Sequence, residues 1–193
     1  MQSQKHFWEL VWFKTVASIR AEASQPFIGY LWWLLEPALF IGIYFLVFGV
    51  IIGNKTPDFI TFLIIGIITF QWFSGSVQMG SSSLQSNAGL IQQLRLNKIL
   101  FPLSSILHDF WRFLFVLIAY AIVIYAFMDV KPTVHLLAVP VLILVQLWAI
   151  LGITLPLAAI FPFIPDIKHV ITPLLRAMLF ISGIFFDADK VPE

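Results

Sequence analysis

The chain has no cysteine among its 193 residues, and charged side chains make up only 11% of it. Without cysteine there is no disulfide framework and no thiolate metal site. Two long segments, residues 59–94 and 136–165, contain no Asp, Glu, Lys or Arg. A soluble domain cannot bury that much uncharged apolar surface, so the composition excludes a water-soluble globular protein. The formal net charge of +1 gives no indication of a nucleic-acid partner.

Apolar residues make up 60% of the chain, and its mean hydropathy is +0.96. A transmembrane helix needs about 20 consecutive apolar residues. Five stretches approach or exceed that length: residues 30–52, 59–77, 102–128, 133–161 and 170–186. They are too long and too uniformly apolar to be strands of a barrel. The sequence therefore predicts an all-α polytopic membrane protein, with five visible transmembrane helices in a single domain over residues 1–193.

Lys and Arg are shared unevenly between the predicted loops. One side of the membrane carries Lys5, Lys14, Arg20, Arg95, Lys98 and Lys168, and the other carries Lys55, Lys131 and Lys190. Because cytoplasmic loops are enriched in basic residues, the N-terminus and the loop between the second and third spans are predicted to be cytoplasmic.

Residues 1–25 precede the first span and combine apolar with basic side chains. Six apolar residues share one side of a helical wheel: Phe7, Trp8, Val11, Trp12, Val16 and Ile19. Two tryptophans beside scattered basic residues are typical of an amphipathic helix at headgroup level. A cytoplasmic helix that packs on its own protein has the same pattern, so both interpretations remain open.

Residues 79–102 form the longest break between predicted spans. Asn87 is a candidate N-cap, and Leu90, Ile91 and Leu94 form a short apolar ridge after it. The pattern predicts a short helix over residues 87–98. Its candidate contact residues are Asn87, Leu90, Ile91, Leu94, Arg95 and Lys98. Periodicity alone favours an ordinary interfacial loop helix over an element against which a partner docks.

Several motifs follow one another in a distinctive order. They are Ile28-Gly-Tyr-Leu-Trp-Trp-Leu-Leu-Glu-Pro37, Gly66 with Trp72-Phe73, Ser86-Asn-Ala-Gly-Leu-Ile91 with Phe101-Pro102, Asp166-Ile-Lys-His-Val170, and Ser182-Gly-Ile-Phe-Phe186 through Val191-Pro-Glu193. This order resembles the ABC-2 type membrane subunits that export polysaccharides such as O-antigen, capsule or teichoic acid. The similarity covers essentially the whole chain.

The resemblance implies a homodimer of permeases joined to two copies of a separate ABC ATPase subunit, which would carry ATP and Mg²⁺. The helix over residues 87–98 would be the coupling element that docks in a groove of that ATPase, with the N-terminal amphipathic helix bracing it. The substrate would be a lipid-linked polysaccharide, and the location a bacterial inner membrane that the chain crosses several times. A sixth span is expected beyond residue 193, and no enzymatic activity or cofactor is expected in this chain.

Ionisable residues inside predicted spans are costly in lipid and normally face protein or water. They are Glu36, His108, Asp109, Arg112 and Arg176, and the candidates for a charge cluster or headgroup entry site are Glu36, Asp109, Arg112 and Arg176. Asp109 and Arg112 stand one turn apart and can pair on one helix face. Two interpretations remain open: an ion-pair cluster that fixes helix packing, or the site where an anionic lipid-phosphate headgroup enters, with Arg112 or Arg176 as its partner.

Aromatic residues make up 16% of the chain. Because sugars stack their apolar C–H faces on aromatic rings, a pore for polysaccharide is expected to be lined by such residues. The candidates are Phe70, Trp72, Phe73, Phe180, Phe185 and Phe186.

Other classes of protein remain open. A secondary transporter would also be polytopic, but no inverted repeat is visible. A membrane enzyme would need clustered catalytic or metal-binding residues, whereas the four histidines are scattered. We therefore expect a transport subunit with no metal site; an ABC-2 exporter of another amphiphile, a lipid or a drug, is the nearest alternative.

Overall fold

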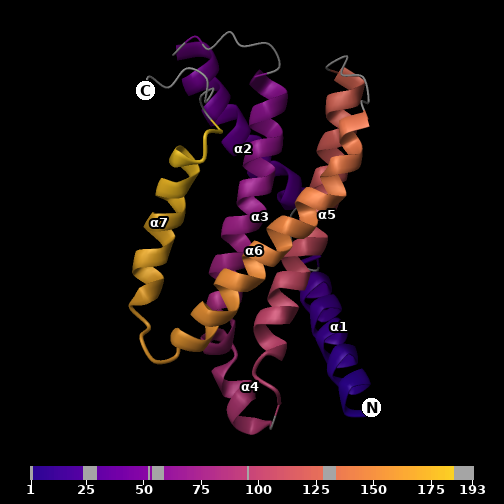
Figure 1. The fold of residues 1–193 in the computed structure, drawn as a ribbon, viewed down its shortest axis with the longest axis vertical. Coiled ribbons are helices and arrows are strands. Elements are labelled where there is room, and N and C mark those ends of the chain that lie inside the picture. The colour runs from indigo at the N-terminus through magenta and orange to yellow at the C-terminus, as the bar shows by residue number, and fades with distance from the viewer. Residues whose placement is uncertain are drawn as a thin grey trace.

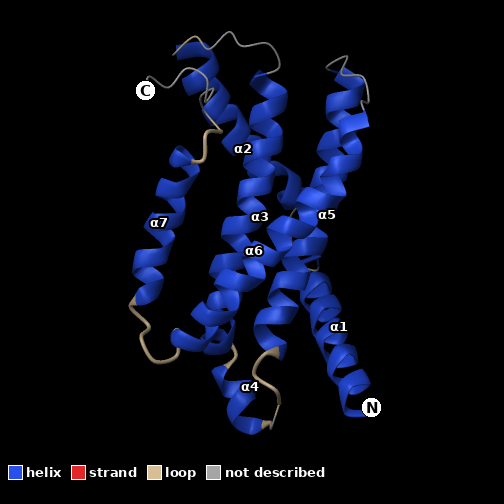
Figure 2. Cartoon of the chain, in the orientation of Figure 1, coloured by secondary structure: helices blue, strands red, loops and turns tan. Residues whose placement is uncertain are grey.

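The computed structural model describes residues 2–23, 30–51, 53, 59–94, 96–127 and 134–184, and every regular element in these ranges is helical. The α-helices are α1 (Gln2–Ala23), α2 (Leu31–Tyr44), α3 (Phe59–Ser86), α4 (Ala88–Gln93), α5 (Leu100–Phe127), α6 (Val139–Ile160) and α7 (Ile167–Ile181). A π-helical segment, η1 (Phe45–Ile51), continues α2, and a 3₁₀ turn, η2 (Val134–Ala138), leads into α6. The long helices follow the long axis of the molecule (Figure 1), and no strand interrupts the described ranges (Figure 2).

Four helical segments among the described residues are long and apolar enough to cross a membrane: Leu31–Ile51, Phe59–Ser86, Leu100–Phe127 and Leu136–Ile160. The shortest has 21 residues. At roughly 1.5 Å per residue it covers about 30 Å, the thickness of a hydrocarbon core. α7 has 15 residues and is not one of the four, so the fifth span expected over residues 170–186 stays a prediction.

α3 runs to Ser86, although the sequence placed the end of this span at residue 77. Three serine hydroxyls in the added turns donate to carbonyls of their own helix: Ser82 to Gln78 at 2.9 Å, Ser83 to Gly80 at 2.6 Å and Ser86 to Ser82 at 3.0 Å. These bonds satisfy the hydroxyls without a partner from elsewhere. The serine-rich stretch therefore continues the helix instead of breaking it.

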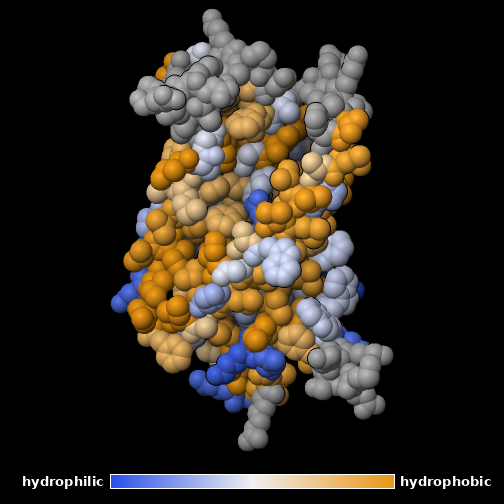
Figure 3. Space-filling view, viewed as in Figure 1, coloured by the Kyte–Doolittle hydropathy of each residue, from blue (hydrophilic) through white to orange (hydrophobic). Residues whose placement is uncertain are grey.

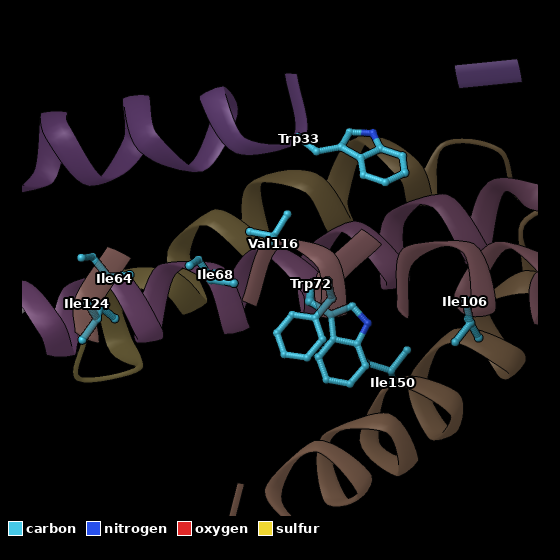
Figure 4. Packing of buried hydrophobic residues seen from close by; sticks show 9 residues of the cluster. Trp33, Ile64, Ile68, Trp72, Ile106, Val116, Ile124 and Ile150 are labelled. Carbon is cyan, nitrogen blue, oxygen red and sulfur yellow. The ribbon is translucent and has the colours of Figure 1, made fainter. Parts of the chain in front are cut away.

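The main hydrophobic core lies between α3, α5 and α6, with α2 against its side (Figure 4). Its buried members are Trp33, Ile64, Ile68, Trp72, Ile106, Phe113, Val116, Ile124 and Ile150. Gly80 lets α3 and α6 approach closely, because a Cβ at this position would lie 2.4 Å from Cγ2 of Thr154.

The outer surface of the described residues is largely apolar around the middle of the molecule (Figure 3). In the most apolar candidate span, Leu136–Ile160, only Ile150, Thr154 and Ala158 are buried. Outward apolar side chains on a helix indicate lipid as the surrounding solvent. Hydrophilic residues gather at the end that carries α4 (Figure 3), and the N-terminus lies at that same end (Figure 1).

α1 packs along α5. Val11 is 1% exposed and joins Leu100 and Phe101 in a small apolar cluster, whereas Trp8 and Trp12 are more than half exposed. The six apolar residues expected on one face are therefore divided between the protein and the surroundings. One side of α1 is a packing face, and the location of the other side at headgroup level stays a prediction.

Candidate functional site

A cavity of about 590 Å³ is enclosed by residues of α2, α3, α5 and α7. The charged residues that were candidates from the sequence all line it: Glu36, Asp109, Arg112 and Arg176. Three of the candidate aromatic residues also line it: Phe70, Trp72 and Phe180. Its volume falls within the roughly 300–1,000 Å³ of typical ligand sites. The structure thus brings residues from four helices to one place.

Arg112 is held by acidic residues from two other helices. Its Nη2 donates to Oε2 of Glu36 on α2, and its Nη1 lies 4.0 Å from Oε1 of Glu22 on α1. The guanidinium also lies over the Trp33 ring, with Cζ 5.9 Å from the ring centroid. The expected partner of Arg112 was Asp109, one turn away, but no ion pair between these two is found among the described contacts. Glu36 takes that place.

His108 and Glu22 belong to the same cluster. Nε2 of His108 lies 3.0 Å from Oε2 of Glu22, and its Nδ1 lies 3.4 Å from Oδ1 of Asp109. This contact with His108 lowers the pKa of Glu22 below its ordinary value. The adjacency of His108 and Asp109 was visible in the sequence. Nothing there pointed to Glu22, which comes from the preceding N-terminal helix.

Asp109 contributes a carboxylate to the cavity wall that is only partly paired. The residue is 8% exposed, and its Oδ2 has no hydrogen-bond partner among the described residues. Gly75 on α3 leaves room beside this oxygen, since a Cβ there would lie 3.7 Å from it. A buried carboxylate oxygen without a donor is costly, so Asp109 brings an unsatisfied acceptor to the cavity wall.

Arg176 reaches the cavity from α7. This helix packs on α3 and the end of α6 through Ile171 and Leu175. Nε2 of Gln78 on α3 also donates to Oγ1 of Thr172, one turn before Arg176, at 2.9 Å. Arg176 is exposed, and no carboxylate in the described part of the chain lies within ion-pair distance of it.

The candidate aromatic residues are placed differently from one another. Trp72 is 5% exposed and stacks on Phe113 with ring centroids 4.2 Å apart, so it is largely a core residue. Phe73 packs on the core and does not line the cavity, although its ring is 6.0 Å from that of Phe70. Phe180 lines the cavity and is half exposed. Phe185 and Phe186 lie outside the described residues.

The element expected over residues 87–98 is shorter in the structure, where α4 covers Ala88–Gln93 and Leu94 is extended. Leu90 and Leu94 are 40% and 50% exposed, and Lys98 is exposed. Ile91 instead packs against the apolar cluster that contains Leu100 and Phe101. The predicted ridge is therefore divided, with Leu90 and Leu94 outside and Ile91 inside. Arg95 lies outside the described residues.

Asn87 occupies the N-cap position of α4, but its side chain makes no capping hydrogen bond. Its Oδ1 accepts from Nζ of Lys14 on α1 at 3.0 Å, and its Nδ2 donates to the carbonyl of Ser83 at 2.7 Å. The Lys14 ammonium also lies 5.3 Å from the centroid of the Phe101 ring. Partial burial lowers the pKa of Lys14. α1 is thus tied to the start of α4 by a contact between residues 73 positions apart in the chain.

The side chains that line the cavity can bind a polar or anionic ligand. Within the described residues no group of three or more His, Asp or Glu side chains is placed to hold a metal ion. The cavity offers guanidinium groups for anions, carboxylates for hydroxyl donors and aromatic rings for apolar faces.

Comparison with known proteins gives one family match and several named relatives. The family model described as ABC-2 type transporter matches residues 9–193. The O-antigen export system permease protein RfbA of Myxococcus xanthus is 28% identical over 175 residues, which cover 91% of this chain and 67% of that protein.

Two further relatives align over similar lengths. An O-antigen export system permease protein RfbA of Klebsiella pneumoniae is 24% identical over 192 residues, covering 97% of this chain and 73% of that protein. The polysialic acid transport protein KpsM of Escherichia coli is 26% identical over 182 residues, covering 91% and 69%. The family match over residues 9–193 covers the cavity helices, α4 and most of α1.

Proposed function

Because the chain belongs to the ABC-2 type transporter family, we propose that it is the membrane permease subunit of an ATP-driven exporter that moves a lipid-linked polysaccharide across a bacterial inner membrane. The observation that carries this proposal is the family match over residues 9–193, together with relatives named for export of O-antigen and transport of polysialic acid. The family is one of transport subunits, not of enzymes.

The cavity supports a polysaccharide substrate. Exposed aromatic rings such as Phe180 and Phe40 give flat apolar faces on which sugar rings stack. Gln71 and Gln78 add amide groups that donate to and accept from hydroxyls. A wall of this composition lets a glycan pass without a single strong anchor. We expect two copies of the chain to face each other as a homodimer and to share the translocation path.

We place the ATPase contact at α4. Leu90 and Leu94 expose apolar surface at the hydrophilic end of the molecule, where no lipid would cover it. Ile91 anchors the same helix to the body, so a force on the exposed side reaches the apolar cluster with Leu100 and Phe101 at the start of α5. ATP and Mg²⁺ would bind to the partner ATPase, and this chain would need no cofactor.

We assign the α4 end to the cytoplasm. The basic residues Lys14, Lys98 and Lys168 belong to the loops and helix ends that were predicted to be cytoplasmic, and an ATPase fed by cellular ATP must dock on that side. The N-terminus shares this end with α4 (Figure 1), so it is cytoplasmic in this arrangement. The contact between Lys14 and Asn87 would let α1 brace the docking element.

Deletion of the gene in its native cell tests the proposed function. We expect polysaccharide to disappear from the cell surface while the lipid-linked polymer accumulates inside, as measured by surface glycan staining and by extraction of glycolipid. Re-expression of the chain should restore polysaccharide at the cell surface and remove the accumulated lipid-linked polymer. Unchanged surface glycan, with retention of a different lipid or a drug, would instead identify the substrate as another amphiphile.

A further inference from the structure

Two arginines line the same cavity but differ in their partners. Arg112 is bound by Glu36, lies 4.0 Å from Glu22 and sits over the Trp33 ring. The two carboxylates offset its charge, and the hydrogen bond to Glu36 fixes its position. Arg112 therefore holds α1, α2 and α5 together and is not available for an anion.

Arg176 has the opposite environment. It is exposed on α7 and lines the cavity, and no carboxylate among the described residues lies within ion-pair distance of it. A guanidinium stays charged at any physiological pH, and its fixed fork of donors matches phosphate oxygens. An unpaired cation facing a largely apolar cavity attracts an anionic ligand.

The balance of charge places an anion on the α7 side. The cluster around Arg112 contains three carboxylates, from Glu22, Glu36 and Asp109, and two basic groups, from Arg112 and His108. A phosphate close to this cluster would be repelled by the excess of carboxylates. The α7 wall contributes Arg176 and no acidic residue.

Asp109 supplies a hydrogen-bond acceptor that complements the donors of Arg176. Its Oδ2 is buried and has no donor among the described residues, so it needs a neutral hydroxyl or amide to satisfy it. The cavity thus combines a donor-only group on α7 with an acceptor-only group on α5 and exposed aromatic rings such as Phe180. A molecule with both an anionic group and hydroxyls matches all three.

We infer that this cavity binds a glycosyl phosphate, with Arg176 pairing with the phosphate and the Asp109 carboxylate accepting a sugar hydroxyl. This inference rests on the proposed function. It assigns the phosphate that joins lipid and glycan in the proposed substrate to Arg176. Arg112 is a positioning residue that holds the opposite wall. We assign the phosphate to the carrier of the glycan: a phosphatidylcholine headgroup has no donor for the Asp109 acceptor, whereas phosphatidylglycerol has hydroxyls, so competition by phosphatidylglycerol is the test that separates the two sources.

The test is direct binding to the permease purified together with its ATPase in phosphatidylcholine nanodiscs. The probes are decyl glucosyl phosphate, in which a phosphodiester joins the alkyl chain and the sugar, and decyl glucoside, which lacks the phosphate. Quenching of tryptophan fluorescence gives the dissociation constants, since Trp33 and Trp72 line the cavity. The variants are Arg176→Gln, Arg176→Lys and Asp109→Asn, with Arg20→Gln as a control that removes an exposed arginine from α1.

We expect Arg176→Gln to weaken binding of the glucosyl phosphate by about tenfold or more, the order set by loss of one charge-assisted pair, and to leave decyl glucoside unchanged. Arg176→Lys should recover part of the loss, and Arg20→Gln should change neither constant. Asp109→Asn should weaken both probes, because both carry the sugar. Arg176 is exposed, so its variants should melt at the wild-type temperature.

Equal effects of Arg176→Gln on both probes, or no effect on either, would overturn the inference. So would displacement of the glucosyl phosphate by phosphatidylglycerol added to the nanodiscs, because the site would then be a general headgroup site. These outcomes are separable from failure of the proposed function. If wild-type cells export glycan but Arg176→Gln binds normally, only the inference fails; if the gene has no effect on surface glycan, the proposed function fails.

Discussion

Arg112 on α5 forms an ion pair with Glu36 on α2, although 76 positions separate them in the chain. Glu36 immediately precedes Pro37, which lies inside α2 and removes one of its backbone hydrogen bonds. Close by, the Tyr120 hydroxyl of α5 donates to the carbonyl of Leu34 at 2.9 Å. α2 is thus fastened to α5 by two contacts that directly precede Pro37, and the Glu36–Arg112 pair lines the cavity.

Neutralising either partner should loosen that wall. We expect Glu36→Gln to destabilise the protein by about 1 kcal/mol, because the pair is partly exposed, which lowers the apparent Tm by roughly 2–4 °C. Arg112→Gln should cost more, since it leaves Glu22 as well as Glu36 without the guanidinium. Thermal unfolding in detergent measures both. If the double variant falls by the full sum of the single losses, the two residues are not coupled.

The close approach of α3 and α6 predicts a sharp steric effect at Gly80. A methyl group there would meet Cγ2 of Thr154 at 2.4 Å, so Gly80→Ala should destabilise the protein by about 1–3 kcal/mol. Thr154→Ser removes that methyl group and should rescue much of the loss in the double variant. The matched control is Gly152→Ala on α6, where a Cβ meets nothing within 4 Å and the apparent Tm should not fall.

The contact between α1 and α4 should affect coupling more than assembly. In the Lys14→Met variant the ammonium that holds Oδ1 of Asn87 is lost, so we expect the ATPase to remain bound while glycan exported per ATP hydrolysed falls several-fold. Asn87→Asp keeps an acceptor for Lys14 and should retain more transport than Asn87→Ala. Lys168→Met, which removes a lysine outside this contact, is the control. Equal transport in all four variants would contradict a bracing role for α1.

Acidification should release α1 from α5. The contact with His108 lowers the pKa of Glu22, so its stabilising contribution is complete above the ordinary value of 4.5 and is lost as the pH falls below that through the lowered value. At pH 7 we expect Glu22→Gln to melt at a lower temperature than the wild type. The difference should shrink as the pH falls below 4.5. A difference that is independent of pH would show that Glu22 acts only through packing.

Much of the site could be predicted from the sequence, because charges in apolar helices are rare enough to stand out. Glu36, Asp109, Arg112 and Arg176 were identified by that argument, and all four line one cavity. The pairing could not be predicted, since helical spacing favours the local partner Asp109 and ignores contacts between helices. Glu22 was missed for the same reason, because its partner His108 is remote in the chain.

The helices could likewise be predicted where the local sequence decides them, and not where distant residues do. The apolar runs gave the four candidate spans, with ends close to the expected ones except in α3. There the serine-rich end predicts a break, whereas hydroxyls such as that of Ser83 donate to carbonyls of their own helix. Asn87 was expected to cap α4, but Lys14 from α1 occupies its side-chain oxygen. The sequence pattern around Asn87 carries no information about this competing contact from a distant helix.

The measurement that tests the central claim most directly is co-purification of the protein with the ABC ATPase of the same cell in detergent. We compare the wild type with a Leu90→Asp, Leu94→Asp double variant. Phe163→Asp with Ile164→Asp serves as the control, because these two apolar residues are also exposed but lie in the turn before α7. We expect the ATPase to accompany the wild type and the control and to be lost from the α4 variant. An ATPase that never co-purifies with the wild type, or that stays bound when α4 carries both aspartates, would contradict the assignment.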